Sequence, residues 1–239
     1  MSPDLLVAMA IAAAAGAMRG FAGVGSGMLM APFFLQLFGP LNTVALIILM
    51  EVVVTAQLLP SVSNEINWRV VAPMGLAAAL LMPVGSWLLV SLDGRLVGKI
   101  VAGVVVVSSI ALMSGWRYHG PRPLAATLGV GAVSGLLMAL TSLGNPPVML
   151  YLLSGRDAAA TNRANFTGYF AITLVALITL MSVSGLLRWS LLPTVAALLP
   201  GFIGFAWIGS RLFRKSSEML YRRIALGILL CAGLYGLAQ

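Results

Sequence analysis

The sequence predicts an all-α polytopic membrane protein, and three observations lead to that fold class. Of the 239 residues, 60% are hydrophobic and only 8% are charged, whereas an average soluble domain is ~25% charged. Apolar runs of helical length recur along the chain. The 14 Lys and Arg outnumber the 6 Asp and Glu, as in membrane proteins whose basic loops fix their orientation. This composition excludes a soluble enzyme, a disordered chain and a secreted disulfide scaffold, and we expect no nucleic-acid partner.

Seven segments are long enough to span a bilayer, because ~20 apolar residues cross ~30 Å of hydrocarbon. They comprise residues 41–59, 70–90, 96–116, 124–140, 162–183, 191–213 and 219–237.

Two regions do not fit this simple pattern. Residues 5–18 are followed by the glycine-rich stretch GFAGVGSG (residues 20–27) and a short apolar run over 28–38. In the second half, the segment that ends at residue 140 is followed by TSLGNPP (residues 141–147) and a short run over 148–153. Each short run reaches only about half of the hydrocarbon thickness. The sequence therefore predicts a broken or re-entrant helix in each half.

The two halves of the chain are weakly similar. A shift of 124 places residues 85–103 on 209–227 without a gap, and Trp68 and Trp189 each open the third segment of their half. A shift of about 115 aligns residues of the two breaks, namely Gly16, Gly20 and Pro32 with Gly131, Gly135 and Pro147. We expect two transmembrane repeats of about four hydrophobic segments each, 1–120 and 121–239, forming one integrated membrane domain.

The path of the broken segments decides how the repeats are oriented. If each broken segment enters and leaves on one side, each repeat makes three crossings and the second repeat is inverted. If it crosses, each repeat makes four crossings and the repeats run parallel. The distribution of Lys and Arg does not separate these arrangements. The shortness of residues 28–38 and 148–153 favours re-entry, and hence inverted repeats whose breaks meet near the membrane centre.

The breaks are the predicted substrate site, because irregular backbone at membrane depth is tolerated where it lines a cavity. Ser26 and Asn145 stand at helix-capping positions, and Pro146 follows at a favoured first helical position. Each short helix then directs free N–H groups and a partial positive charge towards the centre, which suits an anion. The alternative is that the small residues serve only close helix packing.

Arg19 and Glu51 are charged residues within apolar sequence. A cation at the bilayer centre costs ~2.5–3.5 kcal/mol on insertion scales, so Arg19 needs either the anionic substrate or Glu51 as a partner, unless it snorkels to the interface. Burial disfavours the charged form of a carboxyl group, and a nearby arginine favours it. Glu51 is therefore predicted to act either in proton coupling or as a fixed counterion.

A polar helix start, TNRANFTGYF at residues 161–170, supplies neutral donors and one cation. Asn162, Asn165 and Tyr169 recur on one face at helical spacing, with Arg163 on the next. These residue types suit an oxyanion, although interhelical hydrogen bonding explains them too. The complete set of predicted substrate-binding residues is Arg19, Gly25, Ser26, Gly27, Ser142, Gly144, Asn145, Asn162, Arg163, Asn165 and Tyr169.

Three stretches resemble the TauE/SafE sulfite exporter family, also called the 4-toluene sulfonate uptake permease family. They are GFAGVGSGMLMAP, GAVSGLLMALTSLGNPPVMLYLLSG and AATNRANFTGYF, and the similarity extends over nearly the whole chain. The family's usual GGG-type run appears here as Gly25-Ser26-Gly27 and as Ser142-Leu143-Gly144. The resemblance implies movement of small sulfur-containing or organic anions, such as sulfite or sulfonates, across a bacterial inner membrane.

The sequence thus predicts a multi-pass secondary transporter of small anions in the inner (plasma) membrane, with proton coupling as an option. An anion channel or a non-transporting membrane subunit is the alternative. An intramembrane serine protease needs a helical His, whereas His119 falls in a predicted loop, and metal hydrolysis needs a ligand cluster that the composition lacks. We expect no catalytic residues, no metal and no cofactor. The expected partners are a small anionic substrate and lipid, and a homo-oligomer remains an option.

Overall fold

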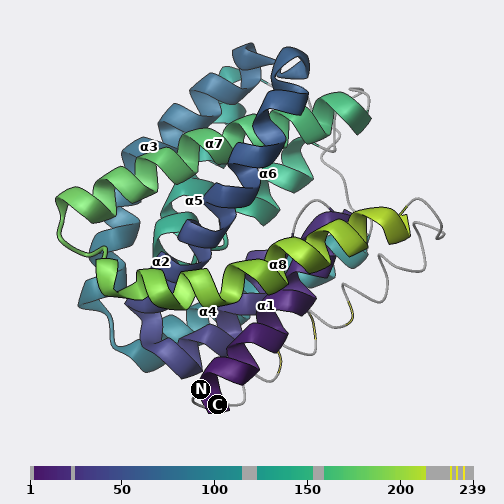
Figure 1. The fold of residues 1–239 in the computed structure, drawn as a ribbon. Coiled ribbons are helices and arrows are strands. Elements are labelled where there is room, and N and C mark those ends of the chain that lie inside the picture. The colour runs from purple at the N-terminus through teal and green to yellow at the C-terminus, as the bar shows by residue number, and fades with distance from the viewer. Residues whose placement is uncertain are drawn as a thin grey trace.

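The computed structural model describes residues 3–22, 25–114, 123–152 and 159–213, together with 227, 230 and 234. Over these residues the chain is helical and contains no strand. Figure 1 shows long helices packed side by side, with shorter pieces between them. In chain order the elements are α1 (Pro3–Ala22), α2 (Ser26–Val62), η1 (Ser63–Glu65), α3 (Trp68–Ser91), α4 (Gly94–Met113), α5 (Leu124–Thr141), α6 (Asn145–Leu152), α7 (Ala159–Val183), η2 (Trp189–Leu191) and α8 (Leu192–Phe213).

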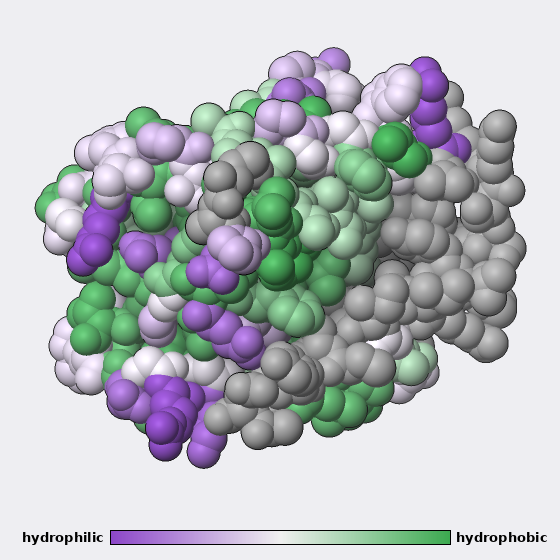
Figure 2. All heavy atoms as spheres, turned by 60° about the horizontal axis from the view of Figure 1, so that its bottom comes forward, coloured by the Kyte–Doolittle hydropathy of each residue, from purple (hydrophilic) through white to green (hydrophobic). Residues whose placement is uncertain are grey.

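Seven helices in the described part of the chain have the length and apolar composition to cross a membrane. Their outer faces carry large apolar side chains, and Leu80 and Val183 are 76% and 84% exposed. Figure 2 shows apolar side chains over much of one face, with strongly hydrophilic side chains at several of its edges and a few in its middle. The prediction of an all-α, multi-pass membrane protein is confirmed. The predicted segment 219–237 lies outside the described residues except for three positions.

Two of the membrane-length helices begin at side chains that cap them. The Asn67 Oδ1 atom accepts a hydrogen bond from the backbone N–H of Arg69 at 3.2 Å, at the start of α3. The Asp93 Oδ2 atom accepts one from Arg95 at 3.1 Å, at the start of α4. Such caps satisfy N–H groups that have no acceptor within the helix.

The short run 28–38 and the segment 41–59 are joined in one kinked helix, α2. Gly39 adopts φ 75° and ψ 170°, and Pro40 follows it without an N–H to donate. Side chains from the next turn bond to the carbonyl groups that the kink frees. The Thr43 hydroxyl donates to Gly39 O at 2.8 Å, and the Asn42 amide donates to Phe38 O at 3.0 Å. The helical backbone is thus interrupted at Gly39, between the two predicted runs, and α2 has one helical part on each side of it.

Helix α1 is longer than the predicted run 5–18, because it continues through Arg19 to Ala22. At 1.5 Å per residue its 20 residues span about 30 Å, so α1 alone has membrane length. By contrast, α6 has eight residues and reaches only about 12 Å. A re-entrant path stays a prediction in both halves.

The first helix of the chain packs closely against the last one described. On α1, a Cβ atom at Gly16 would collide with the carbonyl oxygen of Phe202, and one at Gly20 with that of Ala206, both on α8. Glycine permits this approach because it has no side chain, as in the small-residue crossings of membrane helices.

Helices α5 and α3 pack in the same way. A Cβ atom at Gly131 would collide with the carbonyl oxygen of Met74, and one at Gly135 with that of Ala78. The first helix of each half thus packs on the third long helix of the other half. The halves interlock in one body, and their origin as repeats 1–120 and 121–239 stays a prediction.

Candidate anion-binding site

The first helix break lies between Ala22, where α1 ends, and Ser26, where α2 begins. The predicted capping position of Ser26 is wrong, because Gly25 is the N-cap of α2 and no side chain caps the helix there. Gly25 adopts the left-handed φ of 95°, a conformation that glycine adopts without a steric penalty. Ser26 and Gly27 are buried. The first N–H groups of α2 have no acceptor within the helix, so the break directs hydrogen-bond donors into the protein interior.

A buried ion pair lies beside this break. The Arg19 Nη2 atom is 3.3 Å from Glu51 Oε2, and both side chains are 3% exposed. The Ser26 hydroxyl donates a short hydrogen bond to the other carboxylate oxygen, Oε1. Three residues from α1 and both parts of α2 therefore form one network, which joins the last turn of α1 to the middle of α2.

An aromatic ring covers the arginine from a third element. The Arg19 Cζ atom lies 5.2 Å from the ring centroid of Phe170 on α7, within the ~6 Å over which a ring face attracts a cation. Glu51 and Phe170 contact the guanidinium, Ser26 holds the Glu51 carboxylate, and the arginine charge is balanced inside the protein. The structure gives Arg19 one of its two predicted partners, Glu51, and contact between Arg19 and a substrate stays a prediction.

The second break separates α5, which ends at Thr141, from α6, which begins at Asn145. Ser142 adopts the left-handed φ of 63°, which is rare for a residue with a side chain. The Thr141 hydroxyl accepts from the backbone N–H of Leu143 at 3.2 Å. Ser142 Oγ and Asn145 Oδ1 are buried, and within the described residues neither atom has a hydrogen-bond partner. The second break thus holds polar atoms available to a ligand.

The two breaks touch each other. A Cβ atom built on Gly27 would lie 3.3 Å from the carbonyl oxygen of Ser142 and 3.9 Å from the side chain of Leu143. Ser142 is 2% exposed and Leu143 is 1% exposed. The helix starts at Ser26 and Asn145 therefore belong to one buried region.

Gly144 is held in place by α5 and α7. The Ser134 hydroxyl on α5 donates a short hydrogen bond to Gly144 O, and the Tyr169 hydroxyl on α7 donates to Ser134 Oγ at 2.7 Å. A side chain at position 144 would collide with Ser134 and Met138. Tyr169 thus supports the second break through Ser134, while the neighbouring Phe170 covers Arg19 at the first.

The other predicted residues of α7 have separate surroundings. The Asn165 Oδ1 atom accepts from the backbone N–H of Asn67 at 2.7 Å, so it holds the chain just before α3. Asn162 is 9% exposed. Arg163 belongs to α7, but the structure does not describe its side chain. His119 lies outside the described residues.

Sequence reasoning missed two residues of this region, Ser134 and Phe170. Ser134 lies between Gly131 and Gly135 on a face of small residues, where a hydroxyl is easily taken for packing. Phe170 adjoins a predicted site residue but carries no polar atom. Among the residues that the structure describes, no group of three His, Cys, Asp or Glu side chains is placed to hold a metal ion.

The fold is that of a multi-pass helical membrane protein. Its interior holds a buried ion pair next to two breaks in the helices. The family model described as sulfite exporter TauE/SafE matches residues 8–236, and the chain belongs to this family. The resemblance drawn from the sequence is confirmed. The family is one of transporters, which is consistent with the expectation that the chain is not an enzyme. No curated protein and no solved structure matches the chain.

Proposed function

We propose that the chain is a secondary transporter of small oxyanions, of the sulfite or sulfonate class, in the cell inner membrane. The observation that carries this proposal is the buried Arg19–Glu51–Ser26 network at the contact between two helix breaks. Buried charges within membrane helices are costly and typically mark substrate or ion pathways. The family match supports the anion class.

Glu51 is the negative group that a substrate anion would replace. Its two carboxylate oxygens engage Arg19 and Ser26, which are the donors best suited to an oxyanion. Protonation of Glu51 removes its negative charge and leaves the arginine charge to be balanced by another anion. Anion binding and proton uptake at Glu51 are then linked, and the transporter moves the two together.

The second break supplies neutral donors to the same anion. The Ser142 hydroxyl, which has no hydrogen-bond partner among the described residues, can donate to the anion, whereas the unpartnered Asn145 Oδ1 atom is an acceptor. Gly144 keeps the backbone free of a side chain. Pro146 and Pro147 have no N–H, so Asn145 and Val148 are the donors at the start of α6. At the first break, Gly25 and Gly27 likewise have no side chain that would keep the anion away from the backbone N–H groups.

Residues of α7 complete the proposed site in two roles. Asn162 and Arg163, at the start of the helix, attract the anion. Asn165 and Tyr169 act as positioning residues, because their side chains hold Asn67 and Ser134.

A thermal-shift titration of the detergent-purified protein tests anion binding. Sulfite, taurine, sulfoacetate, thiosulfate and simple carboxylates are the ligands to compare. A ligand at about 100 times its Kd stabilises the folded state by about 2.7 kcal/mol. We expect Arg19→Ala and Asn145→Ala to reduce the shift, while the exposed Arg188→Ala leaves it unchanged. Equal shifts in all three variants would contradict the site.

Transport in proteoliposomes separates a carrier from a channel. A carrier shows saturable uptake and counterflow of labelled anion, because one site faces the two sides in turn. We expect counterflow with the anion that gives the largest thermal shift. An ohmic current without counterflow would favour a channel, and neither signal would favour a non-transporting subunit.

A further inference from the structure

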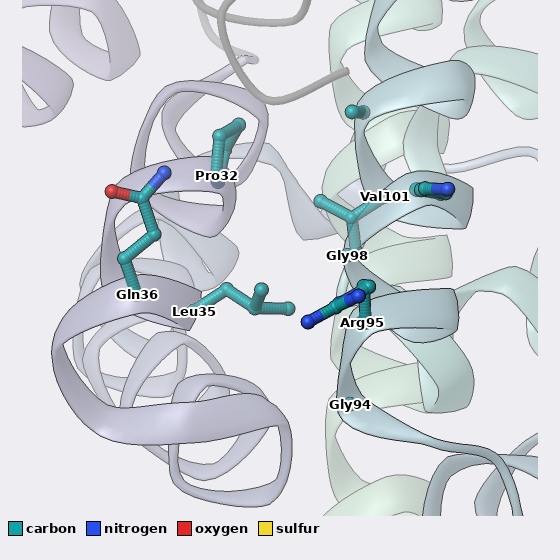
Figure 3. A pocket seen from close by; sticks show the side chains of 9 residues that line it. Pro32, Leu35, Gln36, Gly94, Arg95, Gly98 and Val101 are labelled. Atoms are coloured by element: carbon teal, nitrogen blue, oxygen red, sulfur yellow. The ribbon is translucent and has the colours of Figure 1, made fainter. Parts of the chain in front are cut away.

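A separate cavity of about 130 Å³ lies between the first part of α2 and the first three turns of α4. Figure 3 shows Arg95 and Leu35 extending towards each other from the two helices. None of the residues that line the cavity belongs to the proposed transport site. The lining residues are Pro32, Leu35, Gln36, Gly94, Arg95, Gly98, Lys99, Val101 and Ala102.

Two of the residues that line the cavity, Arg95 and Lys99, are cations. Arg95 and Lys99 are one turn apart on α4, and both side chains are exposed. Neither forms an ion pair with a carboxylate in the part of the chain that the structure describes. The neighbouring Asp93 uses Oδ2 to cap the helix at the N–H of Arg95. Two positively charged side chains without a carboxylate partner among the described residues therefore line one small space.

Glycines keep this space open. A Cβ atom on Gly98 would lie 3.2 Å from the Leu35 side chain, and one on Gly94 would lie 3.5 Å from Pro40. Pockets that enclose a drug-sized ligand have volumes of about 300–1,000 Å³. The cavity is smaller than that range, so it fits a compact anionic group and not a whole organic ligand.

The surface next to the cavity is apolar. Leu96, Val107 and Ile110 on α4 are 46%, 68% and 53% exposed. Ile110 is eleven residues beyond Lys99, which is about three helical turns, so the two side chains project from the same side of α4. A ligand with an anionic head at Lys99 can therefore lay apolar chains along the helix towards Ile110.

We propose that the α2–α4 cavity binds the phosphate of an anionic phospholipid headgroup, with the acyl chains along the exposed face of α4. Basic pockets between membrane helices recognise such headgroups. The small volume fits the phosphate, and the apolar surface accounts for the rest of the lipid. This site is independent of the proposed anion transport.

Lipid binding by the full-length protein tests the proposal. Native mass spectrometry counts phosphatidylglycerol or phosphatidylcholine retained by the detergent-purified chain, and a titration gives the apparent affinity. The test variant is Arg95→Gln/Lys99→Gln. The control is Arg69→Gln/Arg188→Gln, which removes the same charge from exposed positions on other elements. We expect the test variant to bind phosphatidylglycerol about 30-fold more weakly, from the contribution of each cation, and the control to match the wild type.

A second variant keeps both cations and fills the space. Gly98→Val places methyl groups against Leu35, and we expect it to release phosphatidylglycerol as the charge variant does. Inorganic phosphate at the same concentration should not displace the lipid. Displacement by phosphate would identify a soluble-anion site instead. Unchanged phosphatidylglycerol binding in either the charge variant or Gly98→Val would overturn the proposal, whatever the transport assays show.

Discussion

Arg19 and Glu51 depend on each other, because each is a charge buried in the helical body. Arg19 Nη2 lies 3.3 Å from Glu51 Oε2, and Ser26 and Phe170 occupy the other sides of the pair. Replacing a whole buried ion pair with apolar residues is often neutral, whereas removing one partner leaves an uncompensated charge. The pair therefore sets where the last turn of α1 meets α2.

Removing one partner should be worse than removing both. We expect Arg19→Ala and Glu51→Ala each to lower the free energy of unfolding by about 3–5 kcal/mol, and Arg19→Met/Glu51→Leu to lower it by less than either. Chemical unfolding in detergent micelles measures the three values. The exposed Arg69→Ala should change it by less than about 0.5 kcal/mol. Additive losses in the double variant would show that the pair is not coupled.

Glu51→Gln isolates the proton-coupling role. Glutamine has nearly the shape of a protonated glutamate and still offers an oxygen to Ser26, but it cannot release a proton. We expect anion uptake into proteoliposomes to become independent of pH. The exposed Glu65→Gln on η1 is the matched control and should keep the wild-type profile. A pH profile unchanged by Glu51→Gln would remove the coupling role.

The sequence indicated those residues whose charge or helix-breaking neighbours are unusual in an apolar segment. It did not indicate residues that are ordinary in such a segment. Arg19 and Glu51 stand out because a charge in an apolar run is costly. Ser26, Ser142 and Asn145 stand out because glycine and proline interrupt the helices around them. Phe170 gave no such signal, since an aromatic residue in a membrane helix is most simply explained by packing.

At the scale of elements, the helix breaks were easier to predict than the helix ends. Both breaks were predicted, and they lie between residues 22 and 26 and between 141 and 145. The extension of α1 through Arg19 was not predicted, because the carboxylate that pairs with Arg19 belongs to Glu51, beyond the break. The kink of α2 at Gly39 falls between the predicted runs 28–38 and 41–59, but the side-chain bonds from Thr43 and Asn42 across it are not contained in a hydropathy pattern.

Two glycines on α5 test the packing of the helices. A methyl group at Gly131 meets the backbone of Met74, while one at Gly129 has nothing within 4 Å. We expect Gly131→Ala to lower the free energy of unfolding by about 1–3 kcal/mol, the usual cost of overpacking. Gly129→Ala should raise it by about 0.5–1 kcal/mol, because alanine favours a helix more than glycine does. Thermal unfolding in detergent compares the pair. Similar melting temperatures would show that α3 and α5 do not pack this closely.

At the scale of the whole molecule, the orientation of the predicted repeats can be tested at the segment between them. If the repeats are inverted, residues 117–122 lie in the cytoplasm. We expect His119→Cys, in a Cys231→Ala background, to react with a membrane-impermeant maleimide only after the cells are opened. Labelling of intact cells would favour parallel repeats.

The contact between α1 and α8 also affects how the protein is made. The glycines Gly16 and Gly20 of α1 leave the ribosome well before the carbonyl groups of Phe202 and Ala206 on α8, against which they pack. At ~5–20 residues per second, that interval is about ten to forty seconds. During this time α1, which carries Arg19 in its last turn, is in the membrane without α8, the helix against which its glycines pack. A nascent chain stalled before α8 should therefore be the form that the quality-control proteases of the cell remove.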